Sequence, residues 1–315
     1  DKQDSVSFPI DRGQIDKDGY LSHILEDMPE GTFIFNLYHV GVDNSLSISS
    51  EVEGAVYGDI YKSNLNPRKI RLVESLADKV NLYWEEGGNS SNVLFTYTNR
   101  AGEKKTIDIP VSETVTVIDD YVLGGEYSYK TIFLPEKDAL DQFELDSPVD
   151  KFPTYYVGDG SLDDKFPGYP KFDRTTWKIA DFSSEEPTGE GDNGHAALVI
   201  DNDPATFWHS EWSASTAQLP HHITIDMNAV KNIKCVTIAK RQANTDLKTA
   251  HVEVSTDNRS WEIVGKVEFE KTADPNAKTI VLGETKKARY MKLVITESHS
   301  SPSASISEIY ALGTE

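Results

Sequence analysis

Alternation of apolar and polar residues with a period of two is the feature that most constrains this fold, because it recurs throughout the chain. Clear examples are the runs "KVNLYWEE", "NVLFTYTN", "TVTVID", "HHITIDM" and "ARYMKLVITES". Successive side chains of a β-strand point to opposite faces of a sheet, so each run suits a half-buried strand. Patterns with the helical period are nearly absent. The sequence therefore predicts an all-β protein.

The 315 residues are enough for two or three domains. Residues 67–146 are typical of a small antiparallel β-sandwich of fibronectin type. Residues 174–315 contain further strand-like runs at the spacing of a jelly-roll or sandwich. Between them, residues 147–173 mix Pro, Gly, aromatic and acidic residues without periodicity, which indicates a linker. Its "VGDGSLDD" stretch lacks the spacing and terminal Glu of an EF-hand, so we interpret it as solvated linker.

Residues 1–66 contain part of a repeat of the module that follows them. "DSVSFPI" at 4–10 is similar to "KKTIDIPV" at 104–111, and residues 24–40 are similar to residues 117–134. The second copy has three more strands before the matched segment, whereas the first copy has only three residues before it. We therefore expect an incomplete fibronectin-like sandwich whose first strands lie upstream, in a longer natural protein.

Charge and cysteine content limit the partners. The chain has 52 acidic and 31 basic residues and a net charge of −21, which argues against nucleic acids and anionic membrane surfaces as partners. An alternative explanation of the acidity is that the net charge keeps the protein soluble outside the cytosol. The lone Cys235 lies in a strand-like run and is interpreted as a small buried hydrophobe.

No apolar run is long enough for a transmembrane helix, and no signal peptide is present. The chain is either cytoplasmic or has lost an export signal, and the incomplete repeat favours export.

The C-terminal segment resembles the discoidin domain, also called coagulation factor V/VIII type C, and the related family 32 carbohydrate-binding modules. The resemblance is carried by an ordered series of pieces: "IDNDPATFWHS", "LPHHITIDM", "VEVSTDNRSWEIV", "ARYMKLVITES" and "SEIYALG". It implies a jelly-roll β-sandwich that binds ligands at one loop end and does not catalyse a reaction.

The N-terminal modules resemble a family of unassigned function, whose fibronectin-like pairs precede such domains in surface proteins of glycan-foraging Gram-negative bacteria. "EGTFIFNLYHVGVDNSLSISSEVEGAVYGDIY" carries this resemblance. It implies an exported protein of the bacterial outer surface or periplasm, lipid-anchored through an N-terminal segment outside this sequence. Other cell-surface glycan-uptake proteins are then the expected neighbours.

The discoidin resemblance also implies a structural Ca²⁺ beneath the loop that begins at Ile200. Asp201, Asp203 and Thr206 fall where the family has its loop ligands, and Glu308 falls where it has the closing carboxylate. Calcium prefers such hard oxygen ligands. Asn202 replaces the usual Gly, and Asn tolerates a positive φ. The alternative is that the two aspartates only cap a turn.

Trp212 is the tryptophan that we expect to contact a ligand. Trp208 and Trp261 match core positions, whereas Trp212 lies in "HSEWSASTAQLPHH", a loop of small polar residues. An exposed indole face can stack on a sugar ring while polar groups bind its hydroxyls. The candidate polar partners are His209, Glu211, Arg241, Asn244 and His299. The alternative for each of them is a solvated loop residue or a local ion pair.

No catalytic signature is present: the chain has no G-x-S-x-G, no H-E-x-x-H, no Cys-x-x-Cys and no phosphate-binding glycine loop. "GEGDNG" at 189–194 has neither a following helix nor a Lys and is interpreted as a loop. Carboxylate pairs carry no information in so acidic a chain. We therefore expect a protein that is not an enzyme.

Our leading hypothesis is a non-catalytic accessory protein of a bacterial cell surface that binds a glycan at the C-terminal loop end. One alternative is a protein–protein adhesion module that uses the same loops, and another is the accessory part of a larger glycan-degrading enzyme. An exposed Trp212 beside His209 and Arg241 would favour the sugar. A buried Trp212, or a flat apolar loop end, would favour a protein partner.

Overall fold

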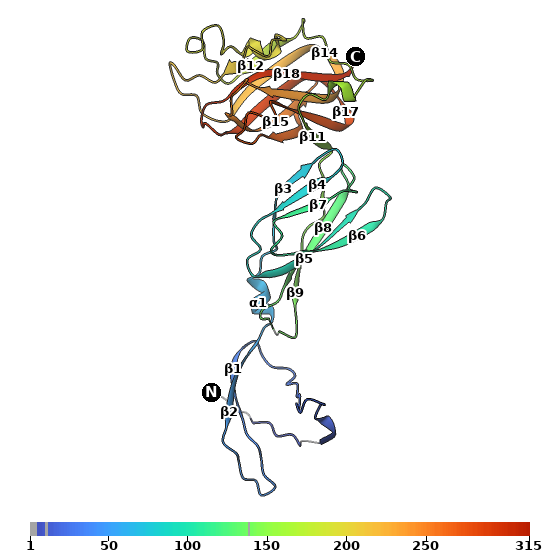
Figure 1. Ribbon diagram of the computed structural model, residues 1–315, viewed down its shortest axis with the longest axis vertical. Helices are drawn as coiled ribbons and strands as arrows, with labels where there is room; N and C mark the ends of the chain where they lie inside the picture. Colours follow the sequence, from blue (N-terminus) through green and yellow to red (C-terminus); the bar gives the residue numbers. More distant parts are fainter. Residues whose placement is uncertain (1–4, 10–11, 138) are drawn as a thin grey trace. The chain divides into compact units, whose positions relative to one another are not determined.

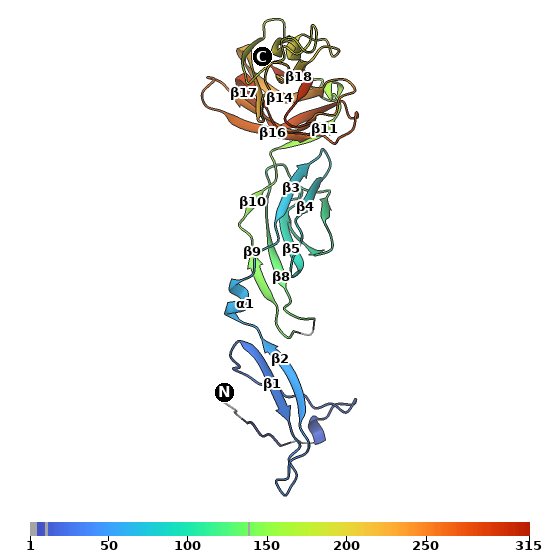
Figure 2. The same ribbon diagram turned by 90° about the vertical axis from the view of Figure 1, so that its left-hand side faces the viewer.

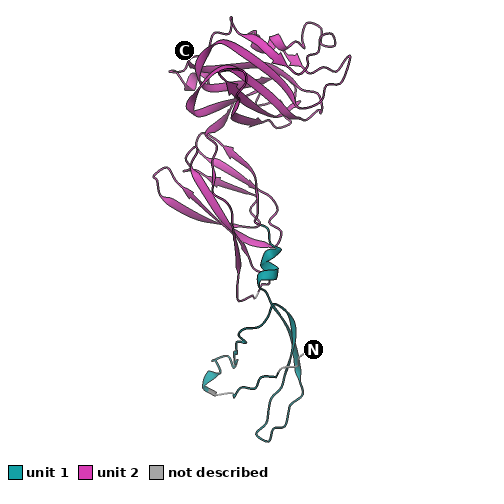
Figure 3. Cartoon of the chain, turned by 180° about the vertical axis from the view of Figure 1, so that it is seen from behind, with its two compact units in different colours: residues 1–66 teal, residues 67–315 magenta. Residues whose placement is uncertain are grey.

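The computed structural model describes residues 5–9, 12–137 and 139–315 and divides the chain into two units, residues 1–66 and 67–315 (Figure 3). Regular structure in the described residues is almost entirely β, which confirms the all-β prediction. None of their helices is long and apolar enough to cross a membrane. Both ends of the 4–10 segment used in the repeat comparison lie outside the described residues.

The first unit is built around one antiparallel strand pair. Strand β1 (Gly31–Leu37) pairs with β2 (Ser50–Val56), a short helix α1 (Asp59–Ser63) follows, and a 3₁₀ turn η1 (Arg12–Gln14) precedes them. None of the described residues of this unit is buried, and residues 5–9 form no strand. Two strands do not enclose a core, so this unit does not form a closed sandwich on its own.

The second unit begins with a β-sandwich, as expected for residues 67–146. Its three-stranded sheet has the order β3-β4-β7, and its five-stranded sheet has the order β10-β8-β5-β6 with β9 added on β8 (Figure 1). Inward-facing side chains of alternating residues, such as Leu82, Trp84, Phe95 and Tyr97, form the core between the sheets. The strands are β3 (Ile70–Ser75), β4 (Val80–Trp84), β5 (Ser90–Thr98), β6 (Lys104–Pro110), β7 (Val115–Ile118), β8 (Glu126–Phe133), β9 (Phe143–Asp146) and β10 (Asp150–Lys151).

The prediction of an irregular linker at residues 147–173 is wrong. Strand β10 lies in this segment and pairs with β8, and Phe152 directly after it is buried in the core of the sandwich. Strand β11 (Tyr155–Asp159) then pairs with a strand of the C-terminal domain. Strands of two and five residues give almost no alternation signal, so only their pairing partners reveal them.

The C-terminal domain is an eight-stranded β-structure that encloses one large hydrophobic core (Figure 2). Its long strands β14 and β17 pair with each other along most of their length, with register shifts where the strands are irregular. Trp208 lies in this core, as expected, and so does Trp177. Besides β11, the strands are β12 (Lys178–Phe182), β13 (Trp208–His209), β14 (His221–Lys240), β15 (Leu247–Ser255), β16 (Glu262–Glu268), β17 (Ala277–Ser298) and β18 (Ser305–Thr314). Two 3₁₀ turns, η2 (Asp163–Lys165) and η3 (Ala196–Ile200), complete the domain.

Several loops of this domain are joined by hydrogen bonds of backbone and side-chain groups, and we call them together the loop end. The Ser210 N–H donates to the Ala304 carbonyl at 2.9 Å, and the His299 N–H donates to the Asp246 carbonyl at 2.8 Å. The His299 ring also lies 2.8 Å from the Phe269 carbonyl. The loop end consists of residues 183–195, 210–220, 241–246, 269–276 and 299–304.

Candidate functional site

Trp212 is exposed at the loop end, with 44% of its surface accessible. Its ring lies against Gly189, where a Cβ atom would come within 2.6 Å of the indole. Only glycine leaves room for the ring in this position. The indole N–H donates to the Glu190 carboxylate at 3.2 Å, which fixes the direction of the ring. One indole edge is therefore held by protein while a large part of the side chain remains accessible.

Arg241 extends this arrangement. Its guanidinium lies 3.5 Å from the second carboxylate oxygen of Glu190, and the two side chains are 30% and 16% exposed. The same guanidinium lies 3.7 Å from the ring centroid of Phe207, a cation–π contact that holds it from the side. Trp212, Glu190 and Arg241 thus form a continuous set that we call the Trp212 cluster. It presents an aromatic surface, a hydrogen-bond acceptor and a hydrogen-bond donor side by side.

Glu186 holds the two loops of the cluster together from beneath. Its side chain is inaccessible to solvent, and its carboxylate accepts the backbone N–H groups of Gly189, Trp212 and Ser213 at 2.8 to 2.9 Å. The Ser213 hydroxyl donates to it as well. Burial by itself raises the pKa of Glu186, but these hydrogen bonds to the ionised form outweigh it and hold the pKa well below its usual range. Glu186 is therefore ionised at neutral pH.

The structure places the other predicted ligand residues less favourably for contact with a ligand. His209 is buried, with Nδ1 2.7 Å from the Ser210 carbonyl, and His299 contacts a backbone carbonyl as described above. Asn244 accepts the Asp246 N–H within its own turn. Glu211 lies next to Trp212 in the chain, is partly buried and accepts the Ser215 hydroxyl. His209, His299 and Asn244 therefore each have a polar side-chain atom engaged by a backbone group.

Sequence reasoning missed Glu186, Gly189 and Glu190. The last two lie in "GEGDNG", for which the sequence alone predicts an ordinary loop. Glu190 and Trp212 are 22 residues apart, and no local pattern indicates that they meet. The usable signal was the glycine at 189, because a glycine often marks close approach to another group.

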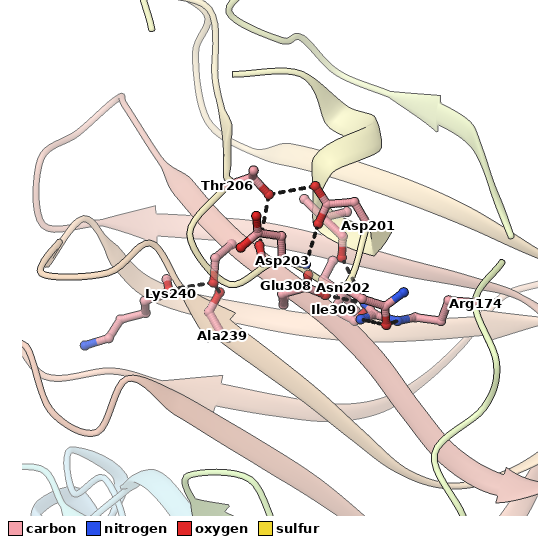
Figure 4. Close-up of polar contacts among 11 residues, drawn as sticks. Arg174, Asp201, Asn202, Asp203, Thr206, Ala239, Lys240, Glu308 and Ile309 are labelled. Carbon is pink, nitrogen blue, oxygen red and sulfur yellow. Dashed lines mark hydrogen bonds and ion pairs between the residues drawn. The ribbon is translucent and has the colours of Figure 1, made fainter. Parts of the chain in front are cut away.

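Residues 201–206 form a compact polar turn next to Glu308 (Figure 4). The Thr206 hydroxyl lies 2.8 Å from the Asp201 carboxylate and 2.9 Å from the Asp203 carbonyl. Asn202 has a φ of 71°, the left-handed conformation that Asn tolerates. The turn therefore gathers a carboxylate, a hydroxyl and a carbonyl oxygen in a small space.

Glu308 completes this group but also has a cationic partner. Its Oε2 atom forms a buried ion pair with Arg174, whereas its Oε1 atom is buried without a hydrogen-bond partner. Burial raises the pKa of Glu308, and the nearby Asp201 carboxyl adds to this rise against the lowering effect of Arg174. A buried carboxyl group with a raised pKa, a second carboxyl group close to it and an unsatisfied buried oxygen together form an arrangement that a cation can relieve.

These residues fit a calcium ion in ligand chemistry. Among the described residues, no group of three or more His, Cys, Asp or Glu side chains is arranged to hold a metal ion. A cation here would therefore take only part of its ligands from Asp201 and Glu308. Thr206 and backbone carbonyls such as that of Asp203 would supply others, which suits calcium because it prefers mixed oxygen ligands.

Comparison with known proteins divides the chain in two. Residues 180–309 match the F5/8 type C domain, and residues 1–143 match a domain of unknown function (DUF4998). A sialidase from Micromonospora viridifaciens is 31% identical over 145 residues, which are 45% of this chain and 22% of the relative. A galactose oxidase from Gibberella zeae is 34% identical over 118 residues, 35% of this chain and 17% of the relative. The chain thus spans about a fifth of the length of these curated relatives.

Solved structures similar to this chain cover a little under half of it. The C-terminal domain of a chitobiase from Bacteroides fragilis is 36% identical, with a TM-score of 0.42 and coverage of 46% of this chain and 97% of that one. A family 32 carbohydrate-binding module from Clostridium perfringens, solved with galactose, is 18% identical, with a TM-score of 0.39 and coverage of 45% and 97%. The chain therefore carries an F5/8 type C (discoidin) domain at residues 180–309, preceded by a segment at residues 1–143 that matches a domain of unknown function.

Proposed function

We propose that this protein is a non-catalytic accessory protein that binds a glycan at the Trp212 cluster. The observation that carries the proposal is the exposed Trp212, held in place by Gly189 and Glu190 beside the guanidinium of Arg241. The ligand class comes from the likeness to family 32 carbohydrate-binding modules, and the position comes from this geometry. A bacterial surface location is part of the same proposal, and protease accessibility on intact cells would check it.

The chemistry of the Trp212 cluster suits a sugar ring. The apolar C–H face of a pyranose can stack on the indole. This stacking contributes more to the binding free energy when the aromatic ring is already held in place. A hydroxyl of the same ring can donate to Glu190 while another accepts from Arg241. Both side chains are partly exposed, so water competes for these hydrogen bonds and the affinity per site is modest.

Binding of the full chain to a broad glycan array, compared with a Trp212→Ala variant, tests the proposal. We expect binding to at least one glycan class and its loss in the variant, because the stacking surface is removed. Ile263→Ala is the matched control, since Ile263 is a large exposed apolar residue on β16, outside the loop end. A blank array, or a Trp212→Ala variant that binds as well as the parent, would contradict the proposal and favour a protein partner for these loops.

We further propose that calcium stabilises the turn at residues 201–206. The ion would neutralise the neighbouring carboxyl groups of Asp201 and Glu308 and tie the turn to β18. Calcium at about 100 times its Kd would add about 2.7 kcal/mol to the free energy of unfolding. The expected result is a higher Tm in saturating calcium than in chelator, measured by scanning calorimetry.

Two variants show whether this effect belongs to the turn. Asp201→Asn should abolish the calcium-dependent rise in Tm, because it removes a charged ligand. Asp192→Asn changes an exposed loop carboxylate and should keep the rise. An identical Tm of the parent protein with calcium and with chelator would contradict the calcium proposal.

A further inference from the structure

The charges around Trp212 are strongly unequal. The Glu186 carboxylate accepts the Trp212 backbone N–H, the Glu190 carboxylate accepts its indole N–H, and Glu211 precedes it in the chain. Arg241 is the cation of the Trp212 cluster, and it is already paired with Glu190 and stacked on Phe207. The immediate surroundings of the indole therefore carry more negative than positive charge.

The rest of the loop end adds to this imbalance. In its residues, acidic side chains outnumber Lys and Arg side chains by eight to two. The acidic residues are Glu185, Glu186, Glu190, Asp192, Glu211, Asp246, Glu270 and Asp274, and the basic residues are Arg241 and Lys271. A ligand that approaches Trp212 therefore meets a negative potential, in agreement with the net charge of −21 of the whole chain.

We infer that the Trp212 cluster selects neutral or amine-bearing glycans and rejects glycans that carry carboxylate or sulfate groups. This inference rests on the proposed function and names the ligand class of the same site. A neutral sugar satisfies Glu190 and Arg241 together, because a hydroxyl both donates and accepts hydrogen bonds.

Anionic groups lack this match. A carboxylate or sulfate only accepts hydrogen bonds, so it cannot bind Glu190, and it must compete with Glu190 for Arg241. An ammonium group only donates, and Glu190 and Glu211 are acceptors for it. The expected order of affinity is therefore amine-bearing and neutral sugars first, and acidic sugars last.

The test uses the full chain and three matched series of monosaccharides. These are galactose with galactosamine and galacturonic acid, glucose with glucosamine and glucuronic acid, and N-acetylglucosamine with its 6-sulfate. Affinities are measured by calorimetry at low ionic strength and again in about 0.5 M NaCl. In every series that binds, we expect the acidic member to bind at least about tenfold more weakly than the neutral one. Added salt should narrow this gap, because it screens the repulsion.

Two variants test whether the difference in affinity between neutral and acidic sugars arises at the Trp212 cluster. Glu190→Gln should reduce the gap between neutral and acidic members, whereas Glu284→Gln, at an exposed position of β17 outside the loop end, should leave it unchanged. An acidic member that binds as tightly as its neutral counterpart, or a gap that salt and Glu190→Gln leave unchanged, would overturn the inference while the proposed function stands. Failure of every series and of the array would overturn both.

Discussion

Replacing Arg174 by methionine is expected to lower the free energy of unfolding by about 3–5 kcal/mol, the usual cost of removing one partner of a buried ion pair. Only 1% of the Arg174 side chain and 6% of the Glu308 side chain are exposed. The guanidinium also donates to the Ile309 carbonyl at 2.9 Å and to the Asn202 side chain. Its removal leaves the Glu308 carboxylate buried near Asp201 without a cationic partner.

Urea denaturation of the parent, of Arg174→Met and of the double variant Arg174→Met/Glu308→Gln measures this effect. The double variant should recover part of the lost stability, because a neutral amide is cheaper to bury alone than a carboxylate. An Arg174→Met protein as stable as the parent would show that solvent reaches Glu308. Calcium should offset part of the loss in Arg174→Met if the ion binds at Asp201 and Glu308.

Glu186→Ala is expected to weaken the affinity for the glycan by at least about 100-fold, although Glu186 itself is inaccessible to solvent. Three backbone N–H groups, those of Gly189, Trp212 and Ser213, lose their common acceptor. The loops that bring Glu190 to Trp212 then separate, and the indole loses its fixed position. Glycan titration followed by tryptophan fluorescence measures both effects, and unchanged affinity would contradict the positioning role.

The pH dependence of Tm gives a second readout for Glu186. Its pKa is lowered in the folded protein, so its stabilising effect is complete above the unfolded value of about 4.3 and is lost as the pH falls below that value. The parent should therefore lose more stability between about pH 5 and pH 3 than Glu186→Gln, which has no carboxylate to protonate. Equal slopes in the two proteins would show that Glu186 does not carry this dependence.

Much of the fold could be predicted from the sequence because the long strands alternate clearly. Residues 93–97 and 223–227 place every second side chain in a core, and this period is visible without a structure. The short strands β10 and β11 could not be found, because two to five residues give no clear period and their pairing partners, β8 and β17, lie elsewhere in the chain. Trp261, expected to pack in the core, is only partly buried, with the Lys292 ammonium 3.8 Å from its ring centroid.

Less of the candidate site than of the fold could be predicted from the sequence. Trp212 stood out because its loop has no alternation that would bury it. Its actual neighbours Glu186 and Glu190 are 26 and 22 residues away in the chain, and only the folded loops bring them together. Arg174 was missed for the same reason, since its partner Glu308 is 134 residues away. His209 lies in the two-residue strand β13 and is buried, which the composition of the surrounding loop does not reveal.

The short segment between β10 and β11 has a mechanical consequence. The Pro153 carbonyl accepts the Gly124 N–H at 3.1 Å, and the adjacent Thr154 carbonyl accepts the Gly283 N–H at 2.8 Å. Two consecutive residues are thus fastened to two different domains, with no slack chain between them. A force that pulls the two domains apart must break these backbone hydrogen bonds before any length of chain is released. A segment fastened in this way holds no chain in reserve, whereas a disordered tether extends gradually as the pulling force rises.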